Sequence, residues 1–222
     1  MSSTKINTAM RVREADPTWE IAHLFPAQGA WSQEEYLDLP GNRLVEFSNG
    51  YLEVLPVPTT SHQALVAYLY GLLFAFVSRR NLGKVFFAPL RVRLWPGKFR
   101  EPDLVFMLRA HARRIGEEFW DRADLVMEVV SGDIEDRRRD LVIKRREYAR
   151  ARIPEYWLID PQESTITVFR LSGTHYTVHG SFTRGDRATS ALLPGFSVDV
   201  SAAFSAGIAA TAAGRKSRRP RR

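Results

Sequence analysis

The stretches REPDLVF at residues 100–106 and DLVMEVVS at residues 124–131 decide the expected fold of this chain. Each contains an apolar run of strand length with an acidic residue embedded in it, Asp103 in the first and Glu128 in the second. An ionised carboxylate inside a sheet core costs several kcal/mol unless it is paired or binds a cation. The two stretches therefore predict neighbouring buried strands whose carboxylates share a cation.

Hydrophobic patterns on either side of these stretches predict a mixed α/β (α+β) domain built on one sheet. Helices are expected at 31–39, where Ser32 and Glu35 have capping-box spacing, after a cap at Thr60 or Ser61, and at 136–152. Alternating patterns predict a hairpin at 43–55, an adjacent strand pair at 85–94 and 99–107, and strands at 155–159, 165–171 and 175–182. No internal repeat is visible.

Composition indicates one globular domain with additions at its ends. The 222 residues are 45% hydrophobic and 11% aromatic, which is enough apolar material for a single large core. Because the chain has no cysteine, disulfides, thiolate zinc sites and a thiol nucleophile are excluded. The expected division is an N-terminal extension at 1–30, a folded domain at 31–204 and a disordered basic tail at 205–222.

The N-terminal stretch and the hydrophobic runs predict a cytoplasmic location and no membrane segment. The first 20 residues are polar and lack the apolar region of a secretory signal. The longest uncharged apolar stretch, residues 64–77, is shorter than the roughly 20 residues that span a bilayer. This stretch is therefore expected to form a buried helix.

The net charge of +7 is unevenly distributed and lies almost entirely in RKSRRPRR at residues 215–222. This segment includes Arg218 and Arg219 and follows an Ala/Gly-rich stretch at 202–214. Two interpretations remain open for it. The segment either adds sequence-independent affinity for nucleic-acid phosphates or is a solvated terminus without a specific role.

The residue types around Asp103 and Glu128 favour phosphoryl chemistry. Two carboxylates on neighbouring strands suit a hard cation such as Mg²⁺ that keeps positions for water and phosphate. Asp140, Lys144 and Tyr148 follow at four-residue steps, so one helix face could present Lys144 to activate water or stabilise charge on the phosphate. The alternative, which spacing alone favours, is a surface ion pair between Asp140 and Lys144.

Further positions have two open interpretations each. His62 at a helix start could contact phosphate or a carboxylate, or serve only in capping and packing. Arg91, Arg93 and Arg100 could bind a nucleic-acid backbone beside the cleft or face solvent from their strands. Rival chemistries lack their signatures, since the sequence has no P-loop, GxGxxG, HExxH or GxSxG pattern and no zinc-like grouping of histidines.

Taken in order, six segments across residues 31–204 resemble the PD-(D/E)XK nuclease superfamily and, within it, the Uma-two-type restriction endonuclease family. These segments are RLVEFSNGYLEVLP, TTSHQALVAYL, FREPDLVF, DLVMEVVSGD, RRDLVIKRREYARARIPEYWLIDP and LLPGFSVDV. The resemblance implies a restriction-endonuclease-like core with a mixed central sheet flanked by helices. It also implies that Asp103 belongs to the PD element, that Glu128 is the second acid, and that Glu46 completes the acidic cluster.

One position departs from the superfamily pattern, because Val130 stands where the lysine would follow the second acid. The family resembled here takes its lysine from the next helix, where Lys144 lies. The resemblance thus implies a Mg²⁺- or Mn²⁺-dependent endonuclease acting on DNA, with the metal at Asp103, Glu128 and Glu46, and with a homodimer for cutting two strands. The alternatives are a non-enzymatic nucleic-acid-binding protein on the same fold and an enzyme for another phosphate ester.

Overall fold

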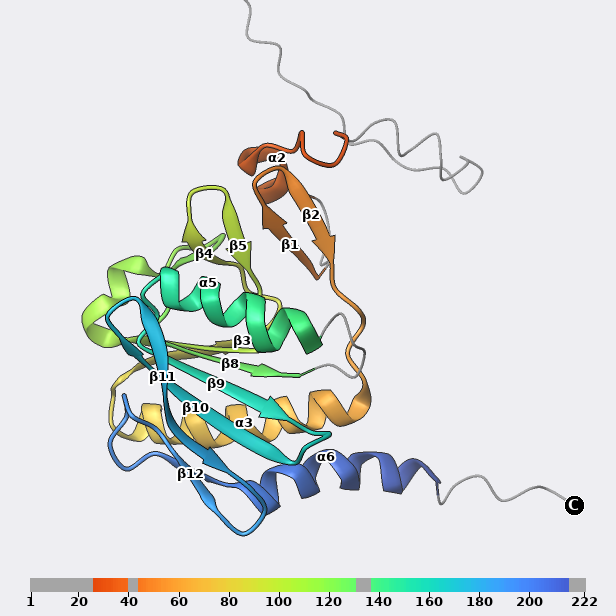
Figure 1. The fold of residues 1–222 in the computed structure, drawn as a ribbon, viewed down its shortest axis with the longest axis vertical. Helices are drawn as coiled ribbons and strands as arrows, with labels where there is room; N and C mark the ends of the chain where they lie inside the picture. Colours follow the sequence, from red (N-terminus) through yellow and green to blue (C-terminus); the bar gives the residue numbers. More distant parts are fainter. Residues whose placement is uncertain (1–25, 40–43, 131–136, 216–222) are drawn as a thin grey trace, which may run out of the picture.

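The computed structural model describes residues 26–39, 44–130 and 137–215, with the side chains of the last helix described as far as residue 209. Figure 1 shows a central sheet with helices on both faces and a smaller sheet beside it. The architecture is the predicted mixed α/β class. The strands, however, form sheets of six, five and two strands, so the prediction of a single sheet is wrong.

The six-stranded sheet is the centre of the fold and has the order β11-β10-β9-β8-β6-β3. Its one parallel pair is β8 with β9, and the other neighbours are antiparallel. Parallel neighbours need a crossover, and the helical segment after β8 provides it. The strands are β3 (Gly83–Phe87), β6 (Leu104–Leu108), β8 (Leu125–Val129), β9 (Glu155–Asp160), β10 (Thr165–Ser172) and β11 (His175–Phe182).

The smaller sheets use the remaining strands. The five-stranded sheet has the order β2-β1-β5-β4-β7, and β12 pairs with β13. The bounds are β1 (Val45–Ser48), β2 (Tyr51–Val54), β4 (Val92–Trp95), β5 (Lys98–Arg100), β7 (Trp120–Asp121), β12 (Arg187–Thr189) and β13 (Ser197–Asp199). The hairpin expected at 43–55 is confirmed as β1 and β2, which pair antiparallel around a turn at 49–50.

The strand pair expected at 85–94 and 99–107 is corrected by the structure. Each predicted strand is interrupted, so that β3 pairs with β6 in the larger sheet while β4 pairs with β5 in the smaller one. The interruptions fall at Pro89 and Pro102. Proline has no N–H for a sheet ladder, so each strand is broken there and its two halves are free to enter different sheets.

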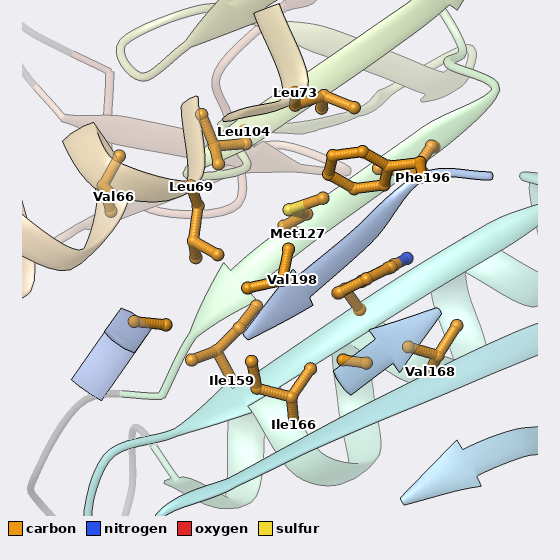
Figure 2. Close-up of a cluster of buried hydrophobic side chains, with 14 of the residues drawn as sticks. Val66, Leu69, Leu73, Leu104, Met127, Ile159, Ile166, Val168, Phe196 and Val198 are labelled. Carbon is orange, nitrogen blue, oxygen red and sulfur yellow. The ribbon is translucent and has the colours of Figure 1, made fainter. Parts of the chain in front are cut away.

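Helices α3 (Thr60–Arg79) and α6 (Val200–Arg215) cover one face of the six-stranded sheet (Figure 1). Helix α3 begins one or two residues earlier than predicted, because its cap is Thr59 and not Thr60 or Ser61: the Thr59 hydroxyl accepts a hydrogen bond from the His62 amide. In Figure 2 Leu69 and Leu73 of α3 face Met127, Ile159 and Phe196 across this core. By length and composition α3 could cross a membrane, but here it packs against the sheet and α6.

The opposite face carries the crossover, a π-helical segment η2 (Arg139–Lys144) that continues into α5 (Arg145–Arg150). Tyr148 of α5 joins a second apolar cluster with Val126, Tyr156 and Phe169. Helix α2 (Gln33–Leu37) has the predicted capping box between Ser32 and Glu35. It lies over the β1–β2 hairpin, and the structure also contains a short 3₁₀ helix, η1 (Arg109–Arg114).

The C-terminal segment differs from the expected tail. Helix α6 runs to Arg215, so residues 205–215 are helical and were not expected to be. Alanine has the strongest helix propensity, and Val200, Ala203 and Phe204 bury the start of the helix in the core. Arg218 and Arg219, like most of the predicted N-terminal extension, lie outside the described residues.

Candidate active site

A cleft of about 1030 Å³ opens where β8 ends and α3 begins. Its walls come from the β2–α3 connector, the first turn of α3, the chain before β6, the end of β8, segment η2 and helix α6. In Figure 1 the end of β8 and the start of α3 lie on the same side of the molecule. The ionisable side chains that line the cleft are His62, Glu101, Asp103, Glu128, Arg139, Asp140, Lys144 and Arg184.

Glu128 lies on β8, within the cleft wall, and is only 3% exposed. Because strand side chains alternate, Glu128 points to the same face as Val130 while Val129 packs toward α3. Its Oε2 accepts a hydrogen bond of 2.9 Å from Lys144 Nζ, and its Oε1 accepts one from the Tyr148 hydroxyl. Both carboxylate oxygens are therefore fixed in orientation.

Asp103 reaches the cleft from just before β6, and not from inside a strand as expected. Its Oδ2 accepts a hydrogen bond of 2.8 Å from the backbone amide of Val129, and the same oxygen lies 3.3 Å from His62 Nε2. The first contact anchors Asp103 next to Glu128. Burial raises the pKa of Glu128 above its usual value; the Lys144 ammonium opposes this shift and the negative charge of Asp103 adds to it.

His62, which the sequence suggested as a phosphate contact, is the partner of Asp103. Burial opposes its protonated form, but the contact with Asp103 outweighs burial and raises the pKa of His62. The other ring nitrogen, Nδ1, is buried without a hydrogen-bond partner. The structure thus places His62 in the carboxylate wall of the cleft, in the first turn of α3.

Lys144 is a buried ammonium surrounded by three carboxylates. Its Nζ lies 2.9 Å from Glu128 Oε2, 3.1 Å from Asp140 Oδ1 and 4.0 Å from Glu46 Oε1. Burial disfavours the charged amine, but these carboxylates outweigh burial and raise the pKa of Lys144. Lys144 therefore stays protonated in this arrangement, which suits charge stabilisation and not the removal of a proton.

The surface ion pair considered for Asp140 and Lys144 is wrong, because their side chains are only 3% and 4% exposed. Asp140, Lys144 and Tyr148 all point toward Glu128, as the four-residue spacing predicted. The sequence alone could not distinguish this arrangement from a solvated helix face.

Glu46 belongs to the charged cluster around Lys144 but does not line the cleft. It lies on β1 with 1% exposure and is absent from the residues that line the cleft. Its carboxylate accepts hydrogen bonds from Arg100 Nη1 and, at 3.1 Å, from the Glu101 amide. Burial opposes its ionisation, but Lys144 and Arg100 outweigh burial and lower the pKa of Glu46. Its link to the cleft is through Lys144.

Glu101 was missed by sequence reasoning. Its side chain lines the cleft, is 5% exposed, and has an Oε2 atom without a hydrogen-bond partner. Burial and the nearby Glu46 carboxylate raise the pKa of Glu101 to about 7. Its position two residues before Asp103 could have identified Glu101 as a candidate site residue. The prediction of one continuous strand at 99–107 hid this signal.

The predicted arginine contacts do not line the cleft. Each of these side chains is engaged by groups of the protein itself. Arg100 is 3% exposed and binds Glu46 and Glu147, Arg91 donates to the Leu37 carbonyl, and Arg93 pairs with Asp121.

The donor chemistry of the cleft suits a hard divalent cation. Asp103, Glu128 and Glu101 supply carboxylate oxygens, the ligands that Mg²⁺ and Mn²⁺ prefer, and Glu101 has an oxygen without a partner. Within the described residues, however, no three histidine or acidic side chains converge in a metal-holding group. Glu128 is occupied by Lys144 and Tyr148, so a cation would have to compete with these internal contacts.

The mixed sheet and its carboxylate–lysine cleft define a protein with a nuclease-type fold. A structure described as a "putative nuclease belonging to DUF820 from Anabaena variabilis ATCC 29413" superposes with a TM-score of 0.64 and 17% identity, covering 80% of this chain and 99% of that one. The family model "Uma2: Putative restriction endonuclease" matches residues 33–201. The chain therefore belongs to the Uma2 family. A search of curated proteins gave no match.

Proposed function

We propose that this protein is a Mg²⁺- or Mn²⁺-dependent endonuclease that hydrolyses phosphodiester bonds in DNA. The observation that carries the proposal is the meeting of Asp103, Glu128 and Lys144 in one cleft wall. These residues come from three separate elements, and they bring two acids and a cation to one place. Membership of a family whose description is "Putative restriction endonuclease" supports a nuclease activity.

Asp103 and Glu128 are the residues that would hold the metal. A bound divalent metal supplies a water of lowered pKa and neutralises charge on the phosphate. Glu46 assists from a distance, because its carboxylate lies 4.0 Å from Lys144 Nζ and helps to keep that ammonium charged and in place. Tyr148 and Lys144 fix the orientation of Glu128.

Lys144 stabilises developing negative charge in this proposal. Its ammonium lines the cleft, and the surrounding carboxylates keep it protonated. A fixed cation in a water-poor site stabilises charge on a phosphate more strongly than it would in bulk water. His62 has a positioning role, since it contacts Asp103 through Nε2.

The proposal is tested with supercoiled plasmid incubated with purified protein and Mg²⁺, Mn²⁺ or a chelator. We expect metal-dependent nicking or linearisation, lowered by orders of magnitude in Asp103→Asn and in Glu128→Gln because both acids would contact the metal. The matched control is Glu117→Gln, an exposed acid outside the cleft, which should cleave as the wild type does.

Full metal-dependent cleavage by Asp103→Asn would overturn the assignment of the site. Plasmid binding without cleavage under any metal would favour the non-enzymatic nucleic-acid-binding alternative. We further propose that the active form is a homodimer, because cutting both strands of a duplex needs two sites. Sedimentation of the wild type during the plasmid assay would test this, and a monomer that produces linear plasmid directly would contradict it.

A further inference from the structure

The helical crossover that carries Lys144 has its acidic side chains on the inward side and exposed arginines on the outward side. Residues 137–152, RRRDLVIKRREYARAR, contain eight basic residues and two acids. Both acids point inward: Asp140 is 2% exposed beside Lys144, and Glu147 binds Lys98 and Arg100. The outward face of this segment therefore carries no acidic side chain.

Four exposed arginines of this segment lie on its outward side, and we call them the arginine strip. None of them forms an ion pair with a carboxylate among the residues that the structure describes. Arg145 and Arg150 lie over the rings of Phe169 and Trp95, which leaves their charges uncompensated. The members are Arg138, Arg145, Arg146 and Arg150. Arg152, which follows α5, is not a member because its guanidinium donates a hydrogen bond of 2.6 Å to the Gly173 carbonyl.

The arginine strip begins beside the cleft at Arg138 and continues away from it along α5. Arg138 precedes η2, whose side chains Asp140 and Lys144 line the cleft, and Arg150 ends α5. In Figure 1 this segment crosses the face of the central sheet opposite α3. At the α-helical rise of about 1.5 Å per residue the twelve steps from Arg138 to Arg150 would span roughly 18 Å, and this is an upper bound because the π-helical part, η2, rises less per residue.

A row of unpaired cations of this length matches a nucleic-acid backbone. Duplex DNA carries one phosphate per roughly 3.4 Å of axis on each strand, so the strip corresponds to at most about five base pairs. Exposed arginines are well suited to phosphate oxygens because their N–H groups form a planar fork. The phosphate-binding role predicted for other arginines is not filled by them, because their side chains contact groups of the protein itself. These arginines are Arg91, Arg93 and Arg100.

We propose that the arginine strip binds the phosphate backbone of duplex DNA beside the cleavage cleft. The inference rests on the proposed function, because that proposal makes DNA the substrate. It assigns to the crossover helix two tasks on opposite sides. The inward side holds Lys144 among the carboxylates, and the outward side binds the duplex along the surface that begins beside the cleft at Arg138.

The test uses Arg138→Gln/Arg146→Gln in the full-length chain. Neither side chain has a hydrogen bond, ion pair or ring contact among the described residues, and glutamine has nearly the same helix propensity as arginine. The matched control is Arg109→Gln/Arg113→Gln in η1, which follows β6 and so lies at the end of that strand away from Asp103. It removes the same charge from another exposed surface.

Binding of a fluorescein-labelled 30-base-pair duplex is followed by anisotropy in chelator, between 50 and 300 mM KCl. We expect Arg138→Gln/Arg146→Gln to weaken binding by about tenfold or more at 100 mM salt. The slope of log K against log salt should fall by about 1.8, since each lost phosphate contact contributes roughly 0.9. The control should bind as the wild type does.

Three results would overturn the inference. If wild type, variant and control bind alike while plasmid cleavage persists, the strip is not the contact surface and the proposed nuclease function survives. If the control loses as much affinity as the variant, the effect is general charge. If the wild type neither binds nor cleaves DNA but binds vesicles containing phosphatidylserine, both proposals fail and the strip contacts anionic lipid.

Discussion

At the scale of single residues, the buried charges around Lys144 set both stability and chemistry. Lys144→Met would leave Glu46, Glu128 and Asp140 close together without their ammonium partner. Removing one partner of a buried ion pair typically costs about 3–5 kcal/mol, because the remaining charge stays desolvated. We expect a loss of this size in the free energy of unfolding, measured by urea titration with circular dichroism.

The matched variant for that measurement is Glu128→Gln. Its amide oxygen can still accept the hydrogen bond from Lys144, and the cluster loses one of its negative charges. We expect its stability to lie within about 1 kcal/mol of the wild type even though cleavage is lost. Equal stability of Lys144→Met and wild type would contradict the buried ion cluster.

Asp160 at the end of β9 governs part of the acid stability. Its carboxylate accepts two hydrogen bonds from Arg137 and two from the backbone amides of Gln162 and Glu163. Partial burial opposes ionisation, but these hydrogen bonds outweigh burial and lower the pKa of Asp160. The contact ties the start of the crossover helix to the β9–β10 turn.

Because the folded pKa of Asp160 lies below its unfolded value of about 3.9, its contribution is present above that value and is lost as the pH falls through the folded pKa. Asp160→Asn should therefore cost about 1–2 kcal/mol at pH 7 and progressively less below pH 4. Urea midpoints at pH 7 and pH 3 measure the difference. A cost that is the same at both values would show that the carboxylate charge is not involved.

At the scale of helices, α3 contains a glycine that the fold does not require. Gly71 lies in the interior of α3, is exposed, and a Cβ there would meet nothing within 4 Å. Glycine in a helix interior costs roughly 0.8–1.0 kcal/mol relative to alanine. Gly71→Ala should raise the free energy of unfolding by about that amount, and an unchanged urea midpoint would contradict this account.

At the contact between α3 and α6, by contrast, Gly207 leaves little room for a side chain. At Gly207 of α6 a Cβ would lie 3.2 Å from the Ser61 carbonyl and 3.8 Å from Leu65 Cβ. Gly207→Leu should push α6 away from α3 and cost about 1–3 kcal/mol through overpacking. Thermal unfolding measures the loss, and a variant as stable as the wild type would show that the two helices separate easily.

The crossover segment shows what helix-scale patterns could and could not predict. The four-residue spacing of Asp140, Lys144 and Tyr148 correctly placed all three on one face. Spacing does not report burial, so it favoured a solvated ion pair where the structure has a buried one. Burial depends on β8 and β1, which lie elsewhere in the sequence.

At the scale of the whole molecule, prolines and long-range pairing divide the chain between two main sheets. The segment 83–108 enters the six-stranded sheet, crosses to the five-stranded sheet as β4 and β5, and returns as β6. This excursion places Glu101 and Asp103 between the sheets, at the cleft. The same arrangement directs Arg100 inward to Glu46, which removes it from the surface.

The sequence by itself determined the features that depend on neighbouring residues. The capping box at Ser32, the three strands after Pro154 and the opposite faces of Glu128 and Val129 follow from local pattern. The tertiary structure alone decided the number of sheets, the burial of Lys144 among its carboxylates, the cleft position of Glu101 and the inward turn of Arg100. Each of these features depends on which distant strands pair and on how completely the packed strands and helices exclude water. Neither property can be predicted from a short stretch of the sequence.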